Sequence, residues 1–260
     1  VHATWNNRII NEALNTLKNG MNGPVHINVP ISEPLFSFTT RNLPAERVFM
    51  ESTKYSPEQV GMQQACEILS NARLPMLVVG QMKETETVAL RHRKNLFDDV
   101  LVYAEAISNF PTDFHPHVIE RCLQNNPQYQ PDVVIHIGGN QINKSIKQIL
   151  RATPQLKVIR IETGKTTPDT FRHLTVLLRS SDAMQTLEQL LSAVAPSPDL
   201  KRLKEKLFHR QTVLPPLSSD NFSDINALAT VLSCVHPHSN TAIHLANSSV
   251  VRNANHYLWN

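Results

Sequence analysis

The middle of the chain alternates short β-branched runs with segments of helical periodicity, and this rhythm constrains the fold more than any other feature. The runs PMLVVG (75–80) and VVIHIGG (133–139) end in glycine and are typical of buried parallel strands. Three further apolar runs are VLVYAEA (100–106), KVIRIE (157–162) and LTVLL (174–178). Helical patterns are expected at 57–70, 84–97, 144–150 and 181–195, with another connecting segment around 118–123. Strands that alternate with helices form βαβ units, so the sequence predicts an α/β fold.

The predicted fold is a doubly wound, mostly parallel sheet with helices on both faces, a Rossmann-like domain at 61–195. On both sides of it the rhythm breaks. Residues 36–60 show little periodicity and are interpreted as a linker, and residues 196–260 as a linker helix followed by the start of another α/β unit, with a strand at TAIHLA (241–246). Residues 1–35 are expected to hold the last helix and strand of a preceding domain. Lone strands leave edge N–H and C=O groups unpaired, so we expect the chain to be a fragment of a longer polypeptide.

Charge and composition exclude several classes of function. The net charge is only +3, and the basic stretches RHRK (91–94) and KRLKEK (201–206) fall on expected helices, where a solvated face is favoured over a nucleic-acid site. No apolar run reaches the roughly 18 residues of a membrane span. The three cysteines lack a C-x-x-C or metal-ligand spacing, which suits reduced thiols and predicts a cytoplasmic protein.

Three motifs resemble the thiamine-diphosphate-dependent enzymes. GPVHINVPISEPL (23–35) is similar to the end of their pyrimidine-binding domain, whose last strand reads G-P-V-x-[IL]-[ND]-x-P. In VVIHIGGNQINKSIKQIL (133–150), Lys144 falls where one branch of the family has a lysine opening a helix. In HLANSSVVRN (244–253), Asn247, Ser248 and Arg252 match N-S-x-x-x-R at the start of the diphosphate-binding domain, although Ala246 stands where the family often has glycine. The branch that fits best joins 2-oxoglutarate to isochorismate in menaquinone biosynthesis.

The resemblance implies a transferase that uses thiamine diphosphate and Mg²⁺. In that branch 2-oxoglutarate loses CO2 on the cofactor, and the resulting carbanion adds to isochorismate, while the protein orients the reactants. The full-length enzyme would be a homodimer or homotetramer with small-molecule substrates. The resemblance places the activating glutamate and the metal ligands outside these residues, so we expect no catalytic residue in the chain. We also expect that the chain alone neither binds the cofactor tightly nor turns over.

Both substrates are dicarboxylates, so their sites need cations and hydroxyl groups. Arg252 lies four residues after Ser248 at an expected strand-to-helix junction, which would place both side chains on one face of the first turn. A guanidinium binds a carboxylate through two parallel hydrogen bonds, and a helix N-terminus adds backbone donors. The alternative is that Ser248 only caps the helix and Arg252 is solvated. The substrate-binding candidates are therefore Ser248, Arg252 and the adjacent Asn247.

Lys144 is a further substrate-binding candidate. It follows a glycine pair and a polar loop at the carboxyl end of a strand, the edge at which open α/β sheets bind ligands. The alternative is a solvated lysine at a helix start. Asn140 and Asn143 in the same loop are weaker candidates.

Two other functions stay open, both of them non-catalytic. The domain could bind a nucleotide, although the sequence around Gly138 lacks G-x-G-x-x-G. It could instead bind an anionic effector if Arg151, Arg160 and Arg172 converge. The pairs His115/His117 and His236/His238 flank prolines without a third ligand in view, so a loop is favoured there over a metal site.

Overall fold

The computed structural model describes residues 6, 9–10, 13–14, 25–29, 42, 59–88, 93–164, 166, 168–212, 223–235 and 243–257. The chain divides into two units, Val1–Tyr55 and Ser56–Asn260. In the first unit, the described residues 9–10 and 13–14 are helical, whereas 25–29 form no regular secondary structure. The strand expected at 23–29 is therefore not formed in its described part. Most of the expected linker at 36–60 lies outside the described residues.

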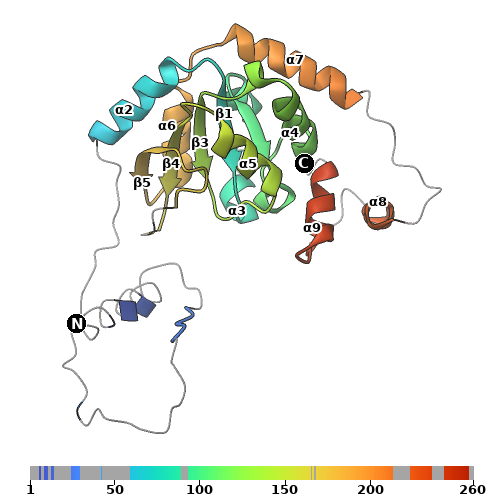
Figure 1. The fold of residues 1–260 in the computed structure, drawn as a ribbon, viewed down its shortest axis with the longest axis horizontal. Coiled ribbons are helices and arrows are strands. Elements are labelled where there is room, and N and C mark those ends of the chain that lie inside the picture. The colour runs from blue at the N-terminus through green and yellow to red at the C-terminus, as the bar shows by residue number, and fades with distance from the viewer. Residues whose placement is uncertain are drawn as a thin grey trace. The chain divides into compact units, whose positions relative to one another are not determined.

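The second unit is built on a five-stranded sheet in which every neighbouring pair is parallel (Figure 1). Its strands run in the order β2-β1-β3-β4-β5. They are β1 (Pro75–Val79), β2 (Leu101–Ala104), β3 (Val133–Ile137), β4 (Lys157–Glu162) and β5 (Leu174–Arg179). Side chains of β1, β2 and β3 are buried throughout, as expected for strands covered on both faces. The predicted doubly wound α/β fold is confirmed.

The helices of this unit match most of the expected positions. They are α2 (Gln59–Ser70), α3 (Glu84–Thr87), α4 (Pro116–Asn125), α5 (Lys144–Ala152), α6 (Ala183–Leu191), α7 (Pro198–Thr212), α8 (Asp224–Cys234) and α9 (Ser249–Asn253), with 3-10 turns η2 (Lys94–Phe97), η3 (Ala106–Ser108), η4 (Pro127–Tyr129) and η5 (Ala254–His256). The single helix expected at 84–97 is wrong. Arg93, before η2, has φ −113° and ψ 48°, which no helix accommodates.

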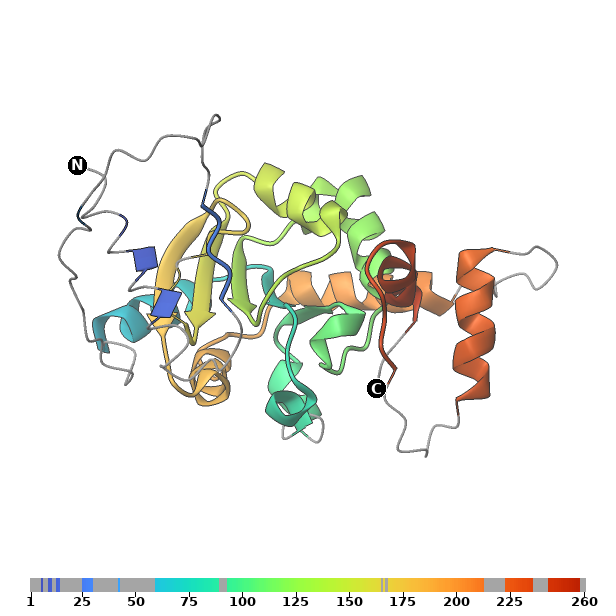
Figure 2. The same ribbon diagram turned by 90° about the horizontal axis from the view of Figure 1, so that it is seen from below.

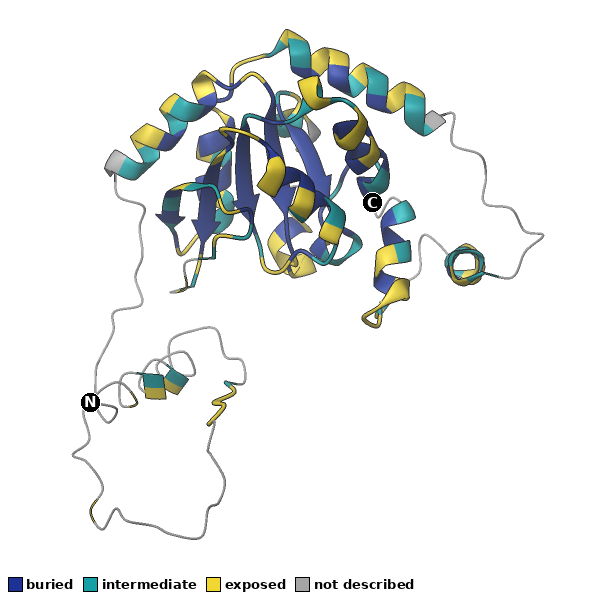
Figure 3. Cartoon of the chain, viewed as in Figure 1, coloured by how far each residue is buried: buried dark blue, intermediate teal, exposed yellow. Residues whose placement is uncertain are grey.

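Two layers of helices cover the sheet (Figures 2 and 3). On one face, α2 and α6 pack against alternate strand residues such as Leu77 and Ile135. On the other face, α4, α5 and α7 pack against Met76, Val134 and Tyr103. The period-2 alternation along each strand therefore separates two apolar cores, and the sheet lies between them.

The segment after α6 differs from its prediction in one place. Its expected helix is α7, which begins at Pro198 and buries Leu200, Leu203 and Leu207 in the core on the α4 face. The strand expected at 241–246 is wrong for the described residues 243–246, which have no strand partner. Among the described residues, no helix is long and apolar enough to cross a membrane.

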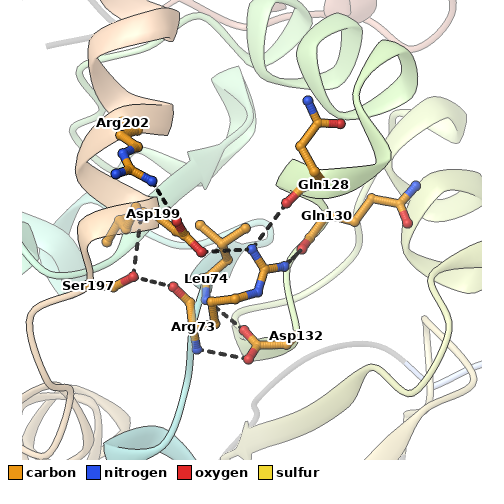
Figure 4. Close-up of polar contacts among 9 residues, drawn as sticks. Arg73, Leu74, Gln128, Gln130, Asp132, Ser197, Asp199 and Arg202 are labelled. Carbon is orange, nitrogen blue, oxygen red and sulfur yellow. Dashed lines mark hydrogen bonds and ion pairs between the residues drawn. The ribbon is translucent and has the colours of Figure 1, made fainter.

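The amino edge of the sheet is tied together by one carboxylate (Figure 4). Asp132, just before β3, accepts hydrogen bonds from the backbone N–H groups of Arg73 (2.8 Å) and Leu74 (2.7 Å), just before β1. The Arg73 guanidinium in turn donates to the carbonyls of Gln128 and Gln130, and it pairs with Asp199 of α7 at 3.3 Å. These contacts fix the starts of two central strands and the start of α7.

Candidate functional site

The order of the strands places the switch point of the fold between β1 and β3, because the chain leaves these strands in opposite directions along the sheet. Ligands of open α/β sheets bind outside the carboxyl ends of the strands at such a point. The two loops that meet there are bonded to each other. The N–H of Gly139 donates to the carbonyl of Gln81 (2.8 Å), and the N–H of Gln81 donates to the carbonyl of Asn140 (3.2 Å).

Glycine is required where these loops meet. A Cβ at Gly80 would lie 2.2 Å from the carbonyl oxygen of Gly139, and Gly138 has φ +83°. The two loops therefore fill the space between the ends of β1 and β3. Gln81, Gly139, Asn140 and Lys144 are exposed at this edge.

Lys144 is the first residue of α5, as the sequence predicted. Asn143 precedes it as the N-cap, and its side-chain oxygen accepts a hydrogen bond from the N–H of Ser145 at 3.1 Å. The ammonium group of Lys147, one turn into the helix, donates to the carbonyl of Gln141 at 2.9 Å. Lys144 is thus an exposed cation on a helix start whose backbone is held on both sides.

The backbone before Lys144 is held by Glu105, which directly follows β2 and is 3% exposed. Its two carboxylate oxygens accept the N–H groups of Ile142 (2.8 Å) and Asn143 (2.9 Å). Burial raises the pKa of Glu105, and the two backbone hydrogen bonds act against that rise. Each of these bonds needs an unprotonated acceptor oxygen, so the contact favours the carboxylate form.

A second buried carboxyl group, Glu120 of α4, completes this network. One of its oxygens accepts the Tyr103 hydroxyl at 2.5 Å and the Asn143 side-chain amide at 2.7 Å. Burial raises the pKa of Glu120 to about 7, and the nearby charge of Glu105 adds to the rise. Burial and the charge of Glu120 also raise the pKa of Tyr103 well above its usual value. Glu120 therefore has a pKa close to neutral and is hydrogen-bonded to Asn143, the residue before Lys144.

The second group of sequence candidates lies at the start of α9. Asn247 and Ser248 form the turn before this helix, and Arg252 lies in its last turn; all three are exposed. The Asn247 side-chain oxygen accepts the N–H of Ser248 at 2.8 Å. Ser248 has φ 87° and ψ −135°, a backbone conformation that favours glycine, and its side chain makes no capping hydrogen bond. Ser248 therefore occupies the N-cap position of α9, but its side chain does not cap the helix.

This segment is docked on η3 and α4 through Asn255 and His256, which follow α9. Asn255 of η5 is 2% exposed, and its side-chain oxygen accepts the N–H of Ala106 at 2.9 Å. Its backbone oxygen lies 3.4 Å from the Nδ1 atom of His117, and the His117 and His256 rings are 4.2 Å apart. Burial lowers the pKa of His117 to about 4, and the neighbouring His256 adds to that effect. The docked contact therefore contains neutral imidazoles at neutral pH.

The structure does not join the two groups of candidates directly. Among the described residues, no hydrogen bond or ion pair links Lys144 to Asn247, Ser248 or Arg252. Residues close to each group instead contact the segment that follows β2: Ile142 and Asn143 bind the Glu105 side chain, and Asn255 binds the N–H of Ala106.

The arginines considered for an effector site do not form a shared cleft in the described part of the chain. Arg160 is 5% exposed and pairs with Glu162 at 2.7 Å, and it also donates to the carbonyl of Gly138. Arg151 is exposed and donates to the carbonyl of Thr170, which lies in the same turn as Arg172. Burial isolates Arg160 from the other two.

The ring of His256, which is distant in the sequence, lies beside the pair His115/His117. The ring centroids of His117 and His256 are 4.2 Å apart, and those of His115 and His117 are 5.5 Å apart. Within the described ranges, no three His, Cys, Asp or Glu side chains are arranged so that they could hold a metal ion. The pair His236/His238 lies outside the described residues.

Sequence reasoning missed Glu105, Glu120 and Asn255. A signal for Glu105 was present, because an acidic residue directly follows the apolar run VLVYA at a strand end. Glu120 and Asn255 carry no comparable signal, since their partners are distant in the sequence.

Curated relatives match almost the whole chain. A 2-succinyl-5-enolpyruvyl-6-hydroxy-3-cyclohexene-1-carboxylate synthase of Bacteroides thetaiotaomicron is 30% identical over 259 residues, covering 96% of this chain and 45% of the relative. The synthases of the same name from Bacteroides fragilis and Phocaeicola vulgatus are each 29% identical, covering 96% and 95% of this chain and 45% and 44% of the relatives.

Two further comparisons add little. No protein-family model matches the chain. An X-ray structure of a candidate thiamin diphosphate-dependent enzyme from Mycobacterium smegmatis matches with a TM-score of 0.39 and 19% identity, over 75% of this chain and 38% of that one, a likeness that supports no argument. The sequence matches confirm the predicted resemblance: the chain is similar to the 2-succinyl-5-enolpyruvyl-6-hydroxy-3-cyclohexene-1-carboxylate synthases and spans about 45% of the length of the relatives it matches.

Proposed function

We propose that this chain is part of a thiamine-diphosphate-dependent carboligase that decarboxylates 2-oxoglutarate and adds the succinyl carbanion to isochorismate. The observation that carries the proposal is the match of 96% of the chain to synthases whose name states the product of this reaction. The products would be 2-succinyl-5-enolpyruvyl-6-hydroxy-3-cyclohexene-1-carboxylate and CO2. The full-length protein would act as a homodimer or homotetramer.

In this proposal the chain supplies cations for substrate carboxylates. Lys144 and Arg252 are exposed, and among the described residues neither side chain pairs with an acidic residue. Ser248 lies four residues before Arg252, with its hydroxyl free of a capping role and its backbone in a strained conformation, which functional sites often retain. The four residues Lys144, Asn247, Ser248 and Arg252 would bind and orient the two dicarboxylates.

Thiamine diphosphate and Mg²⁺ would supply the carbanion chemistry in the full-length protein. Among the described residues, no three His, Cys, Asp or Glu side chains are arranged to hold a metal ion. The chain alone should therefore not bind the cofactor and Mg²⁺ tightly. Calorimetric titration of the chain with thiamine diphosphate and Mg²⁺ tests this point, and micromolar affinity would overturn it.

Turnover by the full-length protein tests the proposal itself. With 2-oxoglutarate, isochorismate, thiamine diphosphate and Mg²⁺, mass spectrometry should detect the succinylated product. Lys144→Ala and Arg252→Ala should each lower kcat/KM about tenfold or more, since a charge-assisted hydrogen bond contributes roughly 1.5–3 kcal/mol. Gln148→Ala, at an exposed position of α5, is the control and should leave kcat/KM unchanged. Absence of product in the unsubstituted protein contradicts the proposal.

A non-catalytic nucleotide-binding module remains the second candidate, since the doubly wound sheet has a switch point of the kind that binds nucleotides. The bonded loops at Gly80 and Gly139 argue against it, because they fill the space at that point. Adenine nucleotide retained by the purified protein would favour this candidate over the carboligase.

A further inference from the structure

The segment that follows β2 contacts residues next to both groups of candidate substrate-binding residues. Through its side chain, Glu105 holds the two N–H groups that precede Lys144. Through its backbone, the next residue, Ala106, holds Asn255, three residues after Arg252. Two segments more than 100 residues apart in the sequence are therefore both held by the adjacent residues Glu105 and Ala106.

We propose that Glu105 is a positioning residue that fixes the loop before Lys144 relative to the Arg252 segment, so that the two cations face the substrate carboxylates at a set separation. The proposal rests on the proposed function for its substrates, whereas the contacts that carry it are independent of turnover.

The geometry at Glu105 supports positioning rather than contact with substrate. The side chain is 3% exposed, so it cannot reach a ligand on the surface. Its two oxygens bind two successive N–H groups, which fixes the loop in both position and orientation. Lys144 carries a flexible four-carbon stem, and a fixed Cα limits the volume that its ammonium group explores.

The second half of the link is equally buried. Asn255 is 2% exposed, and its nitrogen Nδ2 has no hydrogen-bond partner among the described residues. Its oxygen is thus committed to Ala106, and His117 contacts its backbone oxygen. These contacts anchor the end of the segment that carries Arg252, although the turn at Ser248 is exposed.

The test compares Glu105→Gln with Tyr103→Phe. A glutamine offers one acceptor oxygen and one NH2 group, so it cannot accept both N–H groups, whereas Tyr103→Phe leaves these two bonds intact. Hydrogen exchange measured by NMR on the chain should quicken at least about tenfold at the amides of Ile142 and Asn143 in Glu105→Gln. The amides of core strand residues such as Ile135 should keep their exchange rates, which a general loss of stability would not allow.

A distance measurement tests the link to Arg252. Spin labels at Lys144→Cys and Arg252→Cys, in a chain whose three native cysteines are replaced by alanine, should give one narrow distance distribution. The distribution should broaden in Glu105→Gln and, separately, in Asn255→Ala, and it should stay narrow in Tyr103→Phe. If Glu105→Gln does not fold, Glu105→Asp, whose shorter side chain reaches fewer of the two N–H groups, takes its place.

Unchanged exchange at Ile142 and Asn143, or a narrow distribution in Asn255→Ala, overturns the positioning role. Neither readout needs turnover. If the labels behave as expected while the full-length protein makes no product, only the proposed function fails.

Discussion

Two carboxylates at opposite edges of the sheet hold the backbone in the same way. Asp132 at the amino edge accepts the N–H groups of residues 73–74, and Glu105 at the carboxyl edge accepts those of residues 142–143. Their surroundings differ. Asp132 is partly exposed and lies beside surface ion pairs, whereas Glu105 is buried beside a second carboxyl group.

The difference shows how one bonding pattern can have two uses. At the amino edge the bonds join the starts of two strands that the sheet already pairs, so they add stability. At the carboxyl edge they hold a loop outside any strand, and an exposed cation follows that loop. The predictions below compare how much each edge contributes to stability and how that contribution depends on pH.

The largest expected effect is on the amino edge. Asp132→Ala removes the acceptor of two N–H groups, one of which belongs to the buried Leu74, and should lower the free energy of unfolding by about 3 kcal/mol. Urea unfolding of the chain measures the change. Hydrogen exchange at Ile142 and Asn143, compared under strongly native conditions, should not respond, and a selective increase there would erase the distinction between the edges.

The next effect is the pH dependence of the carboxyl edge. The pKa of Glu120 is raised from 4.5 to about 7 by burial, so the folded state binds more protons than the unfolded state between these values. Stability from this group is fully present below about pH 4.5 and is lost as the pH rises towards 7. Glu120→Gln, which resembles the protonated form, should remove about 2 kcal/mol of this loss. The midpoints of urea unfolding at pH 5 and pH 7 measure this loss. An equal change of stability between the two pH values in the unsubstituted protein and in Glu120→Gln would contradict the assignment.

The histidines at the contact between α4 and η5 should respond in the opposite direction. Burial lowers the pKa of His117 to about 4, so stability from this group is fully present above about pH 6.5 and is lost as the pH falls towards 4. His115 and His256, whose pKa values burial also lowers, act in the same sense, and the Arg121 charge disfavours protonation of His117. His117→Gln should reduce the acid loss by roughly 1–2 kcal/mol.

Hydrogen exchange at Ala106 follows this docking directly. Its N–H should exchange faster at pH 5 than at pH 7 after correction for the intrinsic rate, because Asn255 leaves it when the histidines gain charge. His209→Gln, at an exposed position of α7, is the control. A protection of Ala106 that does not change with pH would contradict the prediction.

The smallest expected effect is again at the amino edge. Asp199→Ala breaks the ion pair with Arg73. Because the side chains of Arg73 and Asp199 are 47% and 38% exposed, the change should alter the free energy of unfolding by less than about 0.5 kcal/mol. The same urea experiment measures it. A loss as large as that of Asp132→Ala would mean that the ion pair, and not the backbone bonds, stabilises this edge.

Much of the fold could be predicted from the sequence because its strands are continuous apolar runs. The predicted KVIRIE strand coincides with β4, and VVIHI with β3. The helix expected at 84–97 failed because its periodic pattern does not reveal the non-helical backbone at Arg93. The strand expected at 241–246 is apolar enough, but an apolar run forms a strand only where a neighbouring strand offers hydrogen bonds, and the described residues 243–246 have none.

The candidate site could be predicted only in part. Lys144 was expected at the start of a helix after a strand, a local pattern, and it lies there. The contacts that hold it are not local, since Glu105 and Asn143 are 38 residues apart and Ala106 and Asn255 are 149 apart. The roles of Lys144, Asn247, Ser248 and Arg252 in binding substrate stay predictions.

The packing of α7 has a practical consequence for anyone who produces this unit alone. A chain cut after residue 195, where the alternating pattern ends, would leave the apolar surface that receives Leu200, Leu203 and Leu207 open to water. Exposed surface of that kind promotes aggregation. An expressed segment should therefore begin no later than α2 and continue at least through Thr212.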